Sequence, residues 1–158
     1  MNPPIHLRAA TPGDREFLFE VFAAAGPALE LQSLPDTTLR AQLIQMQFDG
    51  WRTGYSAQFG AEGLKVLEQA SEPLGYIWLS EEPGASRIVD LAFAPAARGK
   101  GIGSELVRSL VANAHREGKP VRASVAKSNH GSLRFNLRLG AVITGESPTH
   151  WAIEWPLA

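Results

Sequence analysis

Apolar and polar residues follow two different periods in the first part of the chain. Residues 5–8 alternate between apolar and polar side chains, which predicts a short strand. Apolar residues at positions 17, 18, 21 and 22 recur at the spacing of one helix face. Thr11 and the proline after it are typical of a helix start, and the Gly-Pro pair at 26–27 is typical of a helix end. The opening segment is therefore predicted as a strand followed by a helix.

A second helical stretch precedes a change to the period of strands. This helix is predicted to begin at Asp36 and to fray near Gly50 or Gly54, and residues 28–35 before it are predicted as a loop. Three segments rich in β-branched, aromatic and other apolar residues follow, separated by turns that contain Pro, Gly, Glu and Ser. These segments are residues 64–68, 74–79 and 87–94. Such short connections predict an antiparallel meander.

A strand-helix-strand unit and two closing strands complete the pattern. Residues 102–114 carry an apolar helical stripe, and Asn129 is placed to cap a shorter helix. Further strands are predicted at 121–125, 141–143 and 151–155. The resulting order, β-α-α-β-β-β-α-β-α-β-β, is of the α+β (mixed α/β) class. We expect a central, mostly antiparallel twisted sheet of about six to seven strands with helices on both faces.

The composition fits one folded domain over residues 1–158. The chain is 44% hydrophobic and 20% charged, and its 158 residues suffice to bury a core. It has no cysteine, so a disulfide framework, a thiolate metal site and a cysteine nucleophile are excluded. No apolar run approaches the ~20 residues that span a bilayer, and residues 1–4 do not begin a signal peptide. We expect a soluble, cytoplasmic protein.

Charge is distributed unevenly along the chain, although the net charge is only −1. Residues 1–97 hold six Lys/Arg and twelve Asp/Glu, whereas residues 98–158 hold nine Lys/Arg and four Asp/Glu. The balanced total argues against nucleic acid as the main partner. The acidic and basic halves favour two partners of opposite charge, unless the solvated charges are placed at random.

Residues 94–104 carry the clearest chemical signal. Three glycines alternate there with other residues, beside Arg98 and Lys100, between a predicted strand and a predicted helix. Glycine lets the backbone turn tightly and approach a ligand, and the first amides of a helix bind anions. The segment therefore predicts a cradle for phosphate or pyrophosphate, with two cations beside it.

Two common phosphate loops do not fit this segment. A P-loop has its lysine directly before Ser or Thr, but Lys100 precedes Gly101. A dinucleotide fingerprint that starts at Gly101 requires glycine or alanine at position 106, which is Leu106. A glycine-rich turn without a chemical role is the alternative that the residues leave.

The segment resembles the diphosphate loop of the GNAT superfamily of N-acetyltransferases, which follows Arg/Gln-x-x-Gly-x-Gly/Ala. Arg98, Gly101 and Gly103 occupy the three specified positions. The loop follows a strand end of the form Leu-x-hydrophobic-x-Pro at residues 91–95, which is similar to the family's pattern.

A second landmark strengthens this resemblance. Asn129, Phe135 and residues 138–141 are similar to the family's segment Asn-x-x-Ala-x-x-x-Tyr-x-x-Leu-Gly-Phe. The order of predicted strands and helices also fits the family. The resemblance therefore covers nearly the whole chain and is most specific over residues 87–141.

The resemblance implies that the chain binds acetyl-CoA as a cosubstrate and uses no metal. In this family the diphosphate lies on the loop amides and the pantetheine runs along the end of the preceding strand. A backbone amide near Phe93 would polarise the thioester carbonyl. The cofactor-binding residues that the resemblance implies are Leu91, Ala92, Phe93, Ala94, Arg98, Gly99, Lys100, Gly101, Ile102, Gly103, Ser104, Asn129 and Phe135.

The catalytic positions depart from the family's pattern. Many members protonate the leaving thiolate with a tyrosine, where this chain has Asn136, and some use a glutamate base where it has Ser124. Asn136 can only hydrogen-bond the sulfur. Asp90, inside the cofactor strand, is a candidate base, an acceptor anchor or a structural partner, and Tyr76 is a candidate acid or a core residue. A base is unnecessary if the amine loses its proton to water.

The acceptor is expected to be a primary amine of a small molecule or a peptide. Residues 26–59 mix acids, amides and aromatics, which suits an amine with an apolar part. A non-catalytic CoA-binding module, acting as a sensor or docking protein, is the alternative, and transfer of a longer acyl group or to a hydroxyl is a third. We expect neither nucleic acid nor a membrane as partner. A homodimer would use Trp151 and Trp155, unless these belong to the core.

Overall fold

The computed structural model describes residues 3–158, so the first two residues of the N-terminal segment discussed above lie outside it. The chain divides into two compact units. The first contains the chain up to residue 78 and residues 90–98, and the second contains residues 79–89 and 99–158. The expectation of a single domain over residues 1–158 stays a prediction.

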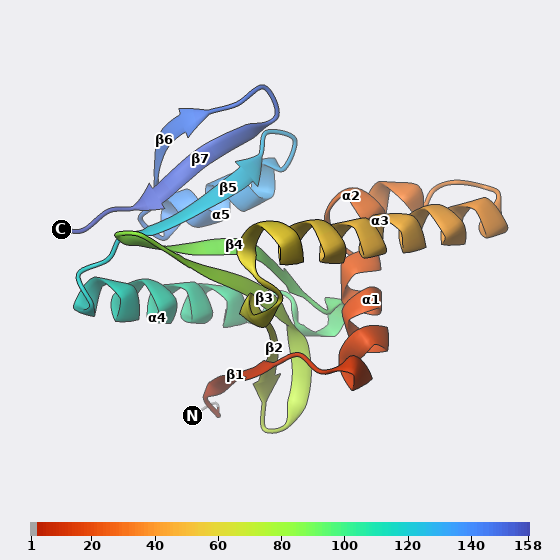
Figure 1. Ribbon diagram of the computed structural model, residues 1–158, viewed down its shortest axis with the longest axis horizontal. Helices are drawn as coiled ribbons and strands as arrows, with labels where there is room; N and C mark the ends of the chain where they lie inside the picture. Colours follow the sequence, from red (N-terminus) through yellow and green to blue (C-terminus); the bar gives the residue numbers. More distant parts are fainter. Residues whose placement is uncertain (1–2) are drawn as a thin grey trace. The chain divides into compact units, whose positions relative to one another are not determined.

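Within the described residues, seven strands form one mixed sheet in the order β1-β2-β3-β4-β5-β7-β6 (Figure 1). The strands are β1 (Ile5–Ala9), β2 (Leu64–Gln69), β3 (Glu72–Glu82), β4 (Ala85–Phe93), β5 (Val121–Ala126), β6 (Val142–Glu146) and β7 (His150–Trp155). Strands β4 and β5 are parallel, whereas the pairs β1–β2, β2–β3, β5–β7 and β6–β7 are antiparallel. The predicted α+β class with a mostly antiparallel sheet is confirmed.

Five α-helices of the described chain connect the strands. They are α1 (Arg15–Ala23), α2 (Gly26–Leu31), α3 (Thr37–Phe59), α4 (Ile102–Arg116) and α5 (His130–Arg138). The cap predicted at Asn129 is present, because its Oδ1 accepts from the Ser132 amide (3.1 Å), and the helix predicted to begin at Asp36 is capped there through the Leu39 amide (2.9 Å). Thr11 precedes a 3-10 turn (Pro12–Asp14) rather than α1 itself. Within residues 3–158, no helix is both long and apolar enough to cross a membrane.

The predicted loop at 28–35 is wrong in its first half, because helix α2 covers Gly26–Leu31. The Gly-Pro pair was interpreted as the end of the first helix, but α1 already ends at Ala23. Gly26 has a φ of +54°, which redirects the chain, and a proline in the first turn of a helix loses no hydrogen bond. The same dipeptide therefore starts a new helix.

Helix α3 continues past both glycines at which the sequence predicted fraying. Trp51, Tyr55 and Phe59 follow one another at intervals of four residues, so they share one helix face. The ring centroids of Trp51 and Trp78 are 5.3 Å apart, and those of Tyr55 and Trp78 are 5.6 Å apart. Packing of these aromatic residues outweighs the ~1 kcal/mol by which each glycine disfavours a helix.

Each unit has its own buried side chains. In the first unit they come from α1, α3, β2 and β3, and include Leu18, Val21, Phe48, Val66, Leu67, Ile77 and Trp78. In the second unit they come from α4, β5 and β7, and include Leu106, Val107, Val121, Ile153 and Trp155. Trp155 is only 3% exposed, so this residue belongs to the core of its unit. The expected homodimer stays a prediction.

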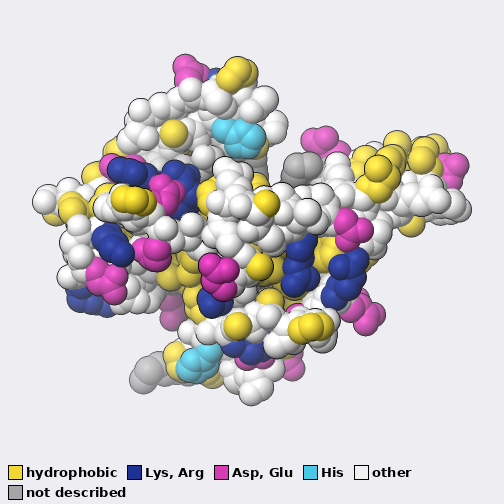
Figure 2. Space-filling view, in the orientation of Figure 1, with side chains coloured by type: hydrophobic (Ala, Val, Ile, Leu, Met, Phe, Trp, Pro, Cys, Tyr) yellow, Lys and Arg dark blue, Asp and Glu magenta, His cyan; other side chains and the backbone are white. Residues whose placement is uncertain are grey.

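An apolar patch lies on α2 and the first half of α3. Leu29, Leu39 and Met46 are exposed there. Figure 2 shows apolar side chains gathered at this end of α3, which lies at the right in Figure 1.

An ion pair joins β1 to the start of α1. Two guanidinium nitrogens of Arg8 donate to the two carboxylate oxygens of Asp14, each at 2.8 Å, and the Thr11 amide donates to Asp14 at 2.7 Å. These hydrogen bonds, that of Arg8 above all, hold the pKa of Asp14 well below its usual range. Because the folded pKa is lowered, the ion pair stabilises the fold above the unfolded pKa of about 4 and is lost progressively below it.

Replacing Asp14 with asparagine is therefore expected to lower the free energy of unfolding by about 2 kcal/mol at pH 7. The difference from the wild type should shrink as the pH falls below about 4. Urea titrations at pH 7 and pH 3 measure both values. Asp49→Asn is the matched control, because Asp49 also pairs with an arginine but is exposed, and it should change little. An Asp14→Asn variant with unchanged stability at pH 7 would contradict the assignment.

Candidate functional site

The glycine-rich segment forms an open turn before α4. Strand β4 ends at Phe93, and a 3-10 turn (Pro95–Ala97) precedes the glycines. Gly99 and Gly101 both have a φ of +75°, a conformation that favours glycine, and Gly101 is the residue that caps α4. A Cβ built on either glycine meets no atom within 4 Å. The backbone is thus open to a ligand where the first amides of α4 lack helical partners.

The Arg98 guanidinium donates hydrogen bonds to two backbone carbonyls. Its Nε donates to the Phe93 carbonyl (3.1 Å), and one terminal nitrogen donates to the Ala24 carbonyl at the end of α1 (2.9 Å). The guanidinium has five N–H donors, so others stay available. Arg98 therefore ties the end of β4 to the end of α1, and its predicted contact with a phosphate stays a prediction.

The end of β4 comes very close to β3. The Ala94 amide donates to the Leu74 carbonyl at 2.8 Å. A Cβ built on the neighbouring Gly75 would lie 2.2 Å from the Ala92 oxygen and 2.8 Å from the Phe93 Cα. Only glycine allows this approach, so Gly75 fixes the position of the predicted pantetheine strand, residues 91–94.

The amide of Phe93 points to the other edge of β4. The register of β4 with β5 covers Ser86, Arg87 and Ile88, and Phe93 lies beyond it. Amides alternate between the two edges of a strand, so the Phe93 N–H faces away from the edge on which the Ala94 amide meets β3. The Phe93 N–H is thus a candidate donor to an oxygen of a bound group.

Asp90 and Tyr76, two predicted catalytic residues, lie in direct contact. The Tyr76 hydroxyl donates to Asp90 Oδ2 at 3.2 Å, and the indole Nε1 of Trp51 donates to the same oxygen at 2.8 Å. Asp90 Oδ1 accepts from the Leu91 amide at 2.9 Å. Sequence reasoning missed the role of Trp51, which it placed in the apolar stripe of a helix and within the acceptor segment. The available signal was the aromatic stripe of α3.

Burial dominates the electrostatics of this cluster. It raises the pKa of Asp90, and the hydrogen bonds from Trp51, Leu91 and Tyr76 oppose this rise because they favour the carboxylate. The pKa of Tyr76 lies well above its ordinary value, through burial and through the charge of Asp90. Burial and Asp90 also raise the pKa of Tyr55. Both phenols therefore stay protonated at neutral pH, and the carboxylate is the group of this cluster that can exchange a proton.

The remaining predicted residues lie on or near α5, in the second unit. Asn129 caps this helix through its side-chain oxygen. Asn136 donates weakly to the Ser132 hydroxyl at 3.5 Å and is half-buried, as is Phe135. Ser124 on β5 is exposed. In residues 3–158, no group of three or more His, Asp or Glu side chains is arranged to hold a metal ion.

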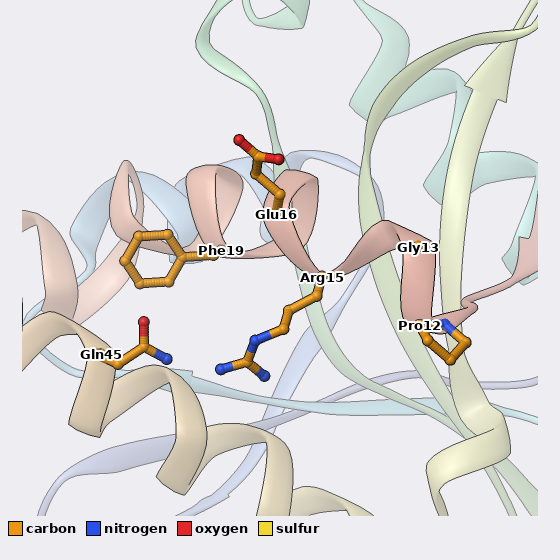
Figure 3. Close-up of a pocket in the computed structure, with 6 residues that line it drawn as sticks. All are labelled: Pro12, Gly13, Arg15, Glu16, Phe19 and Gln45. Carbon is orange, nitrogen blue, oxygen red and sulfur yellow. The ribbon is translucent and has the colours of Figure 1, made fainter.

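One hollow of the first unit lies away from these residues. It has a volume of about 400 Å³ and is lined by Pro12, Gly13, Arg15, Glu16, Phe19 and Gln45. Figure 3 shows Arg15 and Phe19 on the side of α1 that faces Gln45 of α3. Arg15 already pairs with Asp49 at 3.0 Å, and none of the predicted site residues lines this hollow.

Comparisons with known proteins identify the family of the chain. The sequence profile of the acetyltransferase (GNAT) family matches residues 29–141, whereas no curated protein matches the chain in sequence. The PaiA N-acetyltransferase from Thermoplasma acidophilum, solved in complex with coenzyme A, is 16% identical, with 96% of this chain and 98% of that chain covered and a TM-score of 0.68. An acetyltransferase from Thermus thermophilus is 20% identical, with 99% of this chain and 100% of that chain covered and a TM-score of 0.67.

A third similar structure is a chimeric spermidine N-acetyltransferase from Vibrio cholerae, 17% identical, with 95% of this chain and 93% of that chain covered and a TM-score of 0.61. Identities this low show a shared fold. The family profile goes further, because it covers most of the chain and includes both the loop before α4 and the end of β4. On that match, the chain belongs to the GNAT family of acetyltransferases.

Proposed function

We propose that this protein transfers an acetyl group from acetyl-CoA to a primary amine of a small molecule or peptide by direct attack. The observation that carries the proposal is the open turn at Gly99 and Gly101, which leads into the N-terminus of α4. Acetyl-CoA, when bound, supplies an activated thioester carbonyl. The residues described above supply its binding site, the donor for the developing negative charge and the proton acceptor.

The loop fits a diphosphate in shape and in charge. Gly99 and Gly101 leave open space above their backbone, and the first amides of α4 can donate to anionic oxygens. The dipole of α4 adds a partial positive charge at the same end. Lys100 is exposed between the two glycines and adds a full positive charge.

The Phe93 amide is the proposed donor to the carbonyl oxygen of the acetyl group. A fixed N–H at that position stabilises the negative charge that develops when an amine attacks. Arg98 and Gly75 hold this part of β4 in place, the first through its hydrogen bond to the Phe93 carbonyl and the second by allowing the close approach of β3.

Asp90 is the proposed proton acceptor. Its carboxylate takes a proton from the bound ammonium, directly or through water, and the neutral amine then attacks the thioester carbonyl. As the C–N bond forms and the C–S bond breaks, the second proton of the amine leaves to solvent. Tyr76 is a poor acid because its pKa is raised and its hydroxyl is already donated to Asp90, so we assign it to orienting that carboxylate. The thiolate takes its proton from solvent, and Asn136 can donate a hydrogen bond to the sulfur.

Replacing Gly101 with valine is expected to weaken acetyl-CoA binding at least tenfold, measured by titration calorimetry. A side chain there would fill the open space above the loop and would have to adopt a left-handed backbone conformation. Gly118→Val is the matched control, because Gly118 has nearly the same φ (+76°) and equally open surroundings just beyond the other end of α4.

The two variants separate ligand binding from backbone strain. Both should lose a similar amount of stability, but only Gly101→Val should lose affinity for acetyl-CoA. Equal affinity of both variants would show that the loop does not hold the diphosphate. Tight binding of acetyl-CoA without thiol release in the presence of any amine would favour the alternative, a non-catalytic CoA-binding module.

A further inference from the structure

Asp90 offers one hydrogen-bonding position that its described neighbours in the first unit do not use. Each carboxylate oxygen can accept about two hydrogen bonds. Oδ2 accepts from Trp51 and Tyr76, whereas Oδ1 accepts from the Leu91 amide alone. Asp90 as a whole residue is half-buried. Asp90 Oδ1 can therefore accept one further hydrogen bond, from an N–H of a bound group, and its orientation is fixed by the three existing hydrogen bonds.

An aromatic cluster centred on Trp51 lies beside this carboxylate. The Trp51 ring lies 5.0 Å from that of Tyr76, 5.2 Å from Phe22, 5.3 Å from Trp78 and 6.4 Å from Tyr55, centroid to centroid. Trp51 and Tyr55 are half-buried, so part of each ring is reachable from outside. Indole and phenol rings attract cations to their faces and pack well against flat apolar groups.

In the described part of the first unit, the acidic residues other than Asp90 are either paired with an arginine or exposed to solvent. Helix α3 carries one acidic residue, Asp49, which already accepts from Arg15 and Gln45. Asp14 and Glu68, on neighbouring elements of the first unit, are both paired with Arg8. A second positive charge would thus enter an apolar surrounding without a partner, which is costly.

We propose that the acceptor is a small primary amine with one positive charge on an aromatic arm, bound by Asp90 and by the rings of Trp51 and Tyr55. This inference rests on the proposed function, because it names the substrate class of the same site. Asp90 Oδ1 accepts from the ammonium, and the rings of Trp51 and Tyr55 hold the arm. The single carboxylate discriminates against amines with several charges.

Direct binding of probe amines to the wild-type protein tests this proposal. The probes are 2-phenylethylamine, spermidine and 2-phenylethanol, titrated by calorimetry without acetyl-CoA. We expect 2-phenylethylamine to bind at least tenfold more tightly than either of the others, because spermidine lacks the ring and adds charges, and the alcohol lacks the charge. Spermidine or the alcohol binding as tightly as 2-phenylethylamine, or no binding of that amine, would overturn the proposal.

Two variants separate the charge from the rings. Asp90→Asn should weaken the binding of 2-phenylethylamine at least tenfold and leave the binding of 2-phenylethanol unchanged. Tyr55→Leu should weaken the binding of both probes. The order of the three probe affinities for the wild-type protein tests the proposal even if Asp90→Asn fails to fold. Thiol release from acetyl-CoA, measured in parallel, tests the proposed function separately. Binding of 2-phenylethylamine without thiol release supports the acceptor class and counts against acetyl transfer.

Discussion

Alanine at position 75 is expected to lower the free energy of unfolding by about 3 kcal/mol, a large effect for one added methyl group. The new Cβ would lie 2.2 Å from the Ala92 oxygen, 2.8 Å from the Phe93 Cα and 3.1 Å from the Ala92 carbonyl carbon. All three are backbone atoms, so no side chain can rotate away. Relief requires β3 and the end of β4 to separate, which would also displace the Phe93 amide.

Urea titration of Gly75→Ala measures this loss, and Gly54→Ala is its matched control. Gly54 lies within α3 with nothing within 4 Å of a built Cβ, so the same added methyl should stabilise the helix by about 1 kcal/mol. The two changes are chemically identical and should act in opposite directions. An unchanged midpoint for Gly75→Ala would mean that the strands do not approach as described.

Local pattern was sufficient to predict the strands, most of the helices and the glycine-rich turn, but not α2 or the full length of α3. Predictions of this kind depend only on neighbours within a few residues. They include the stripe over residues 102–114, the helix start at Asp36, the cap at Asn129 and the glycines before α4. Such short-range rules act identically in any fold. The Gly-Pro pair at 26–27 was misread because the dipeptide can end one helix or start another, and the pattern favoured the first.

The cluster around Asp90 could not be predicted in the same way. Trp51 and Asp90 are 39 residues apart, and their contact depends on how α3 packs against β3 and β4. In the sequence, Trp51 is one more apolar residue of a helix stripe. Gly75 did carry a signal, because a glycine inside a strand often marks a close approach of another backbone. The sequence did not indicate which strand approaches it.

Replacing Asp90 with asparagine is expected to lower turnover between about 10²- and 10⁴-fold, the range that a positioned base contributes. Turnover is measured as thiol released from acetyl-CoA with 2-phenylethylamine as acceptor. The amide side chain would keep the shape of the carboxylate and could accept from Trp51, but it cannot take a proton. Asp49→Asn removes the same charge from an exposed position of the first unit and should leave turnover unchanged.

The pH dependence separates a base from an anchor that only holds the amine. Burial raises the pKa of Asp90, so wild-type turnover should fall as the pH drops through a value above the ordinary carboxyl range. The same shift disfavours the folded state as the pH rises, because the unfolded chain ionises Asp90 more readily. Asp90→Asn should therefore lose both dependences. The indole N–H resonance of Trp51, which donates to this carboxylate, reports the ionisation without any acceptor. If turnover does not follow this titration, Asp90 only holds the amine, and water accepts the proton of the ammonium.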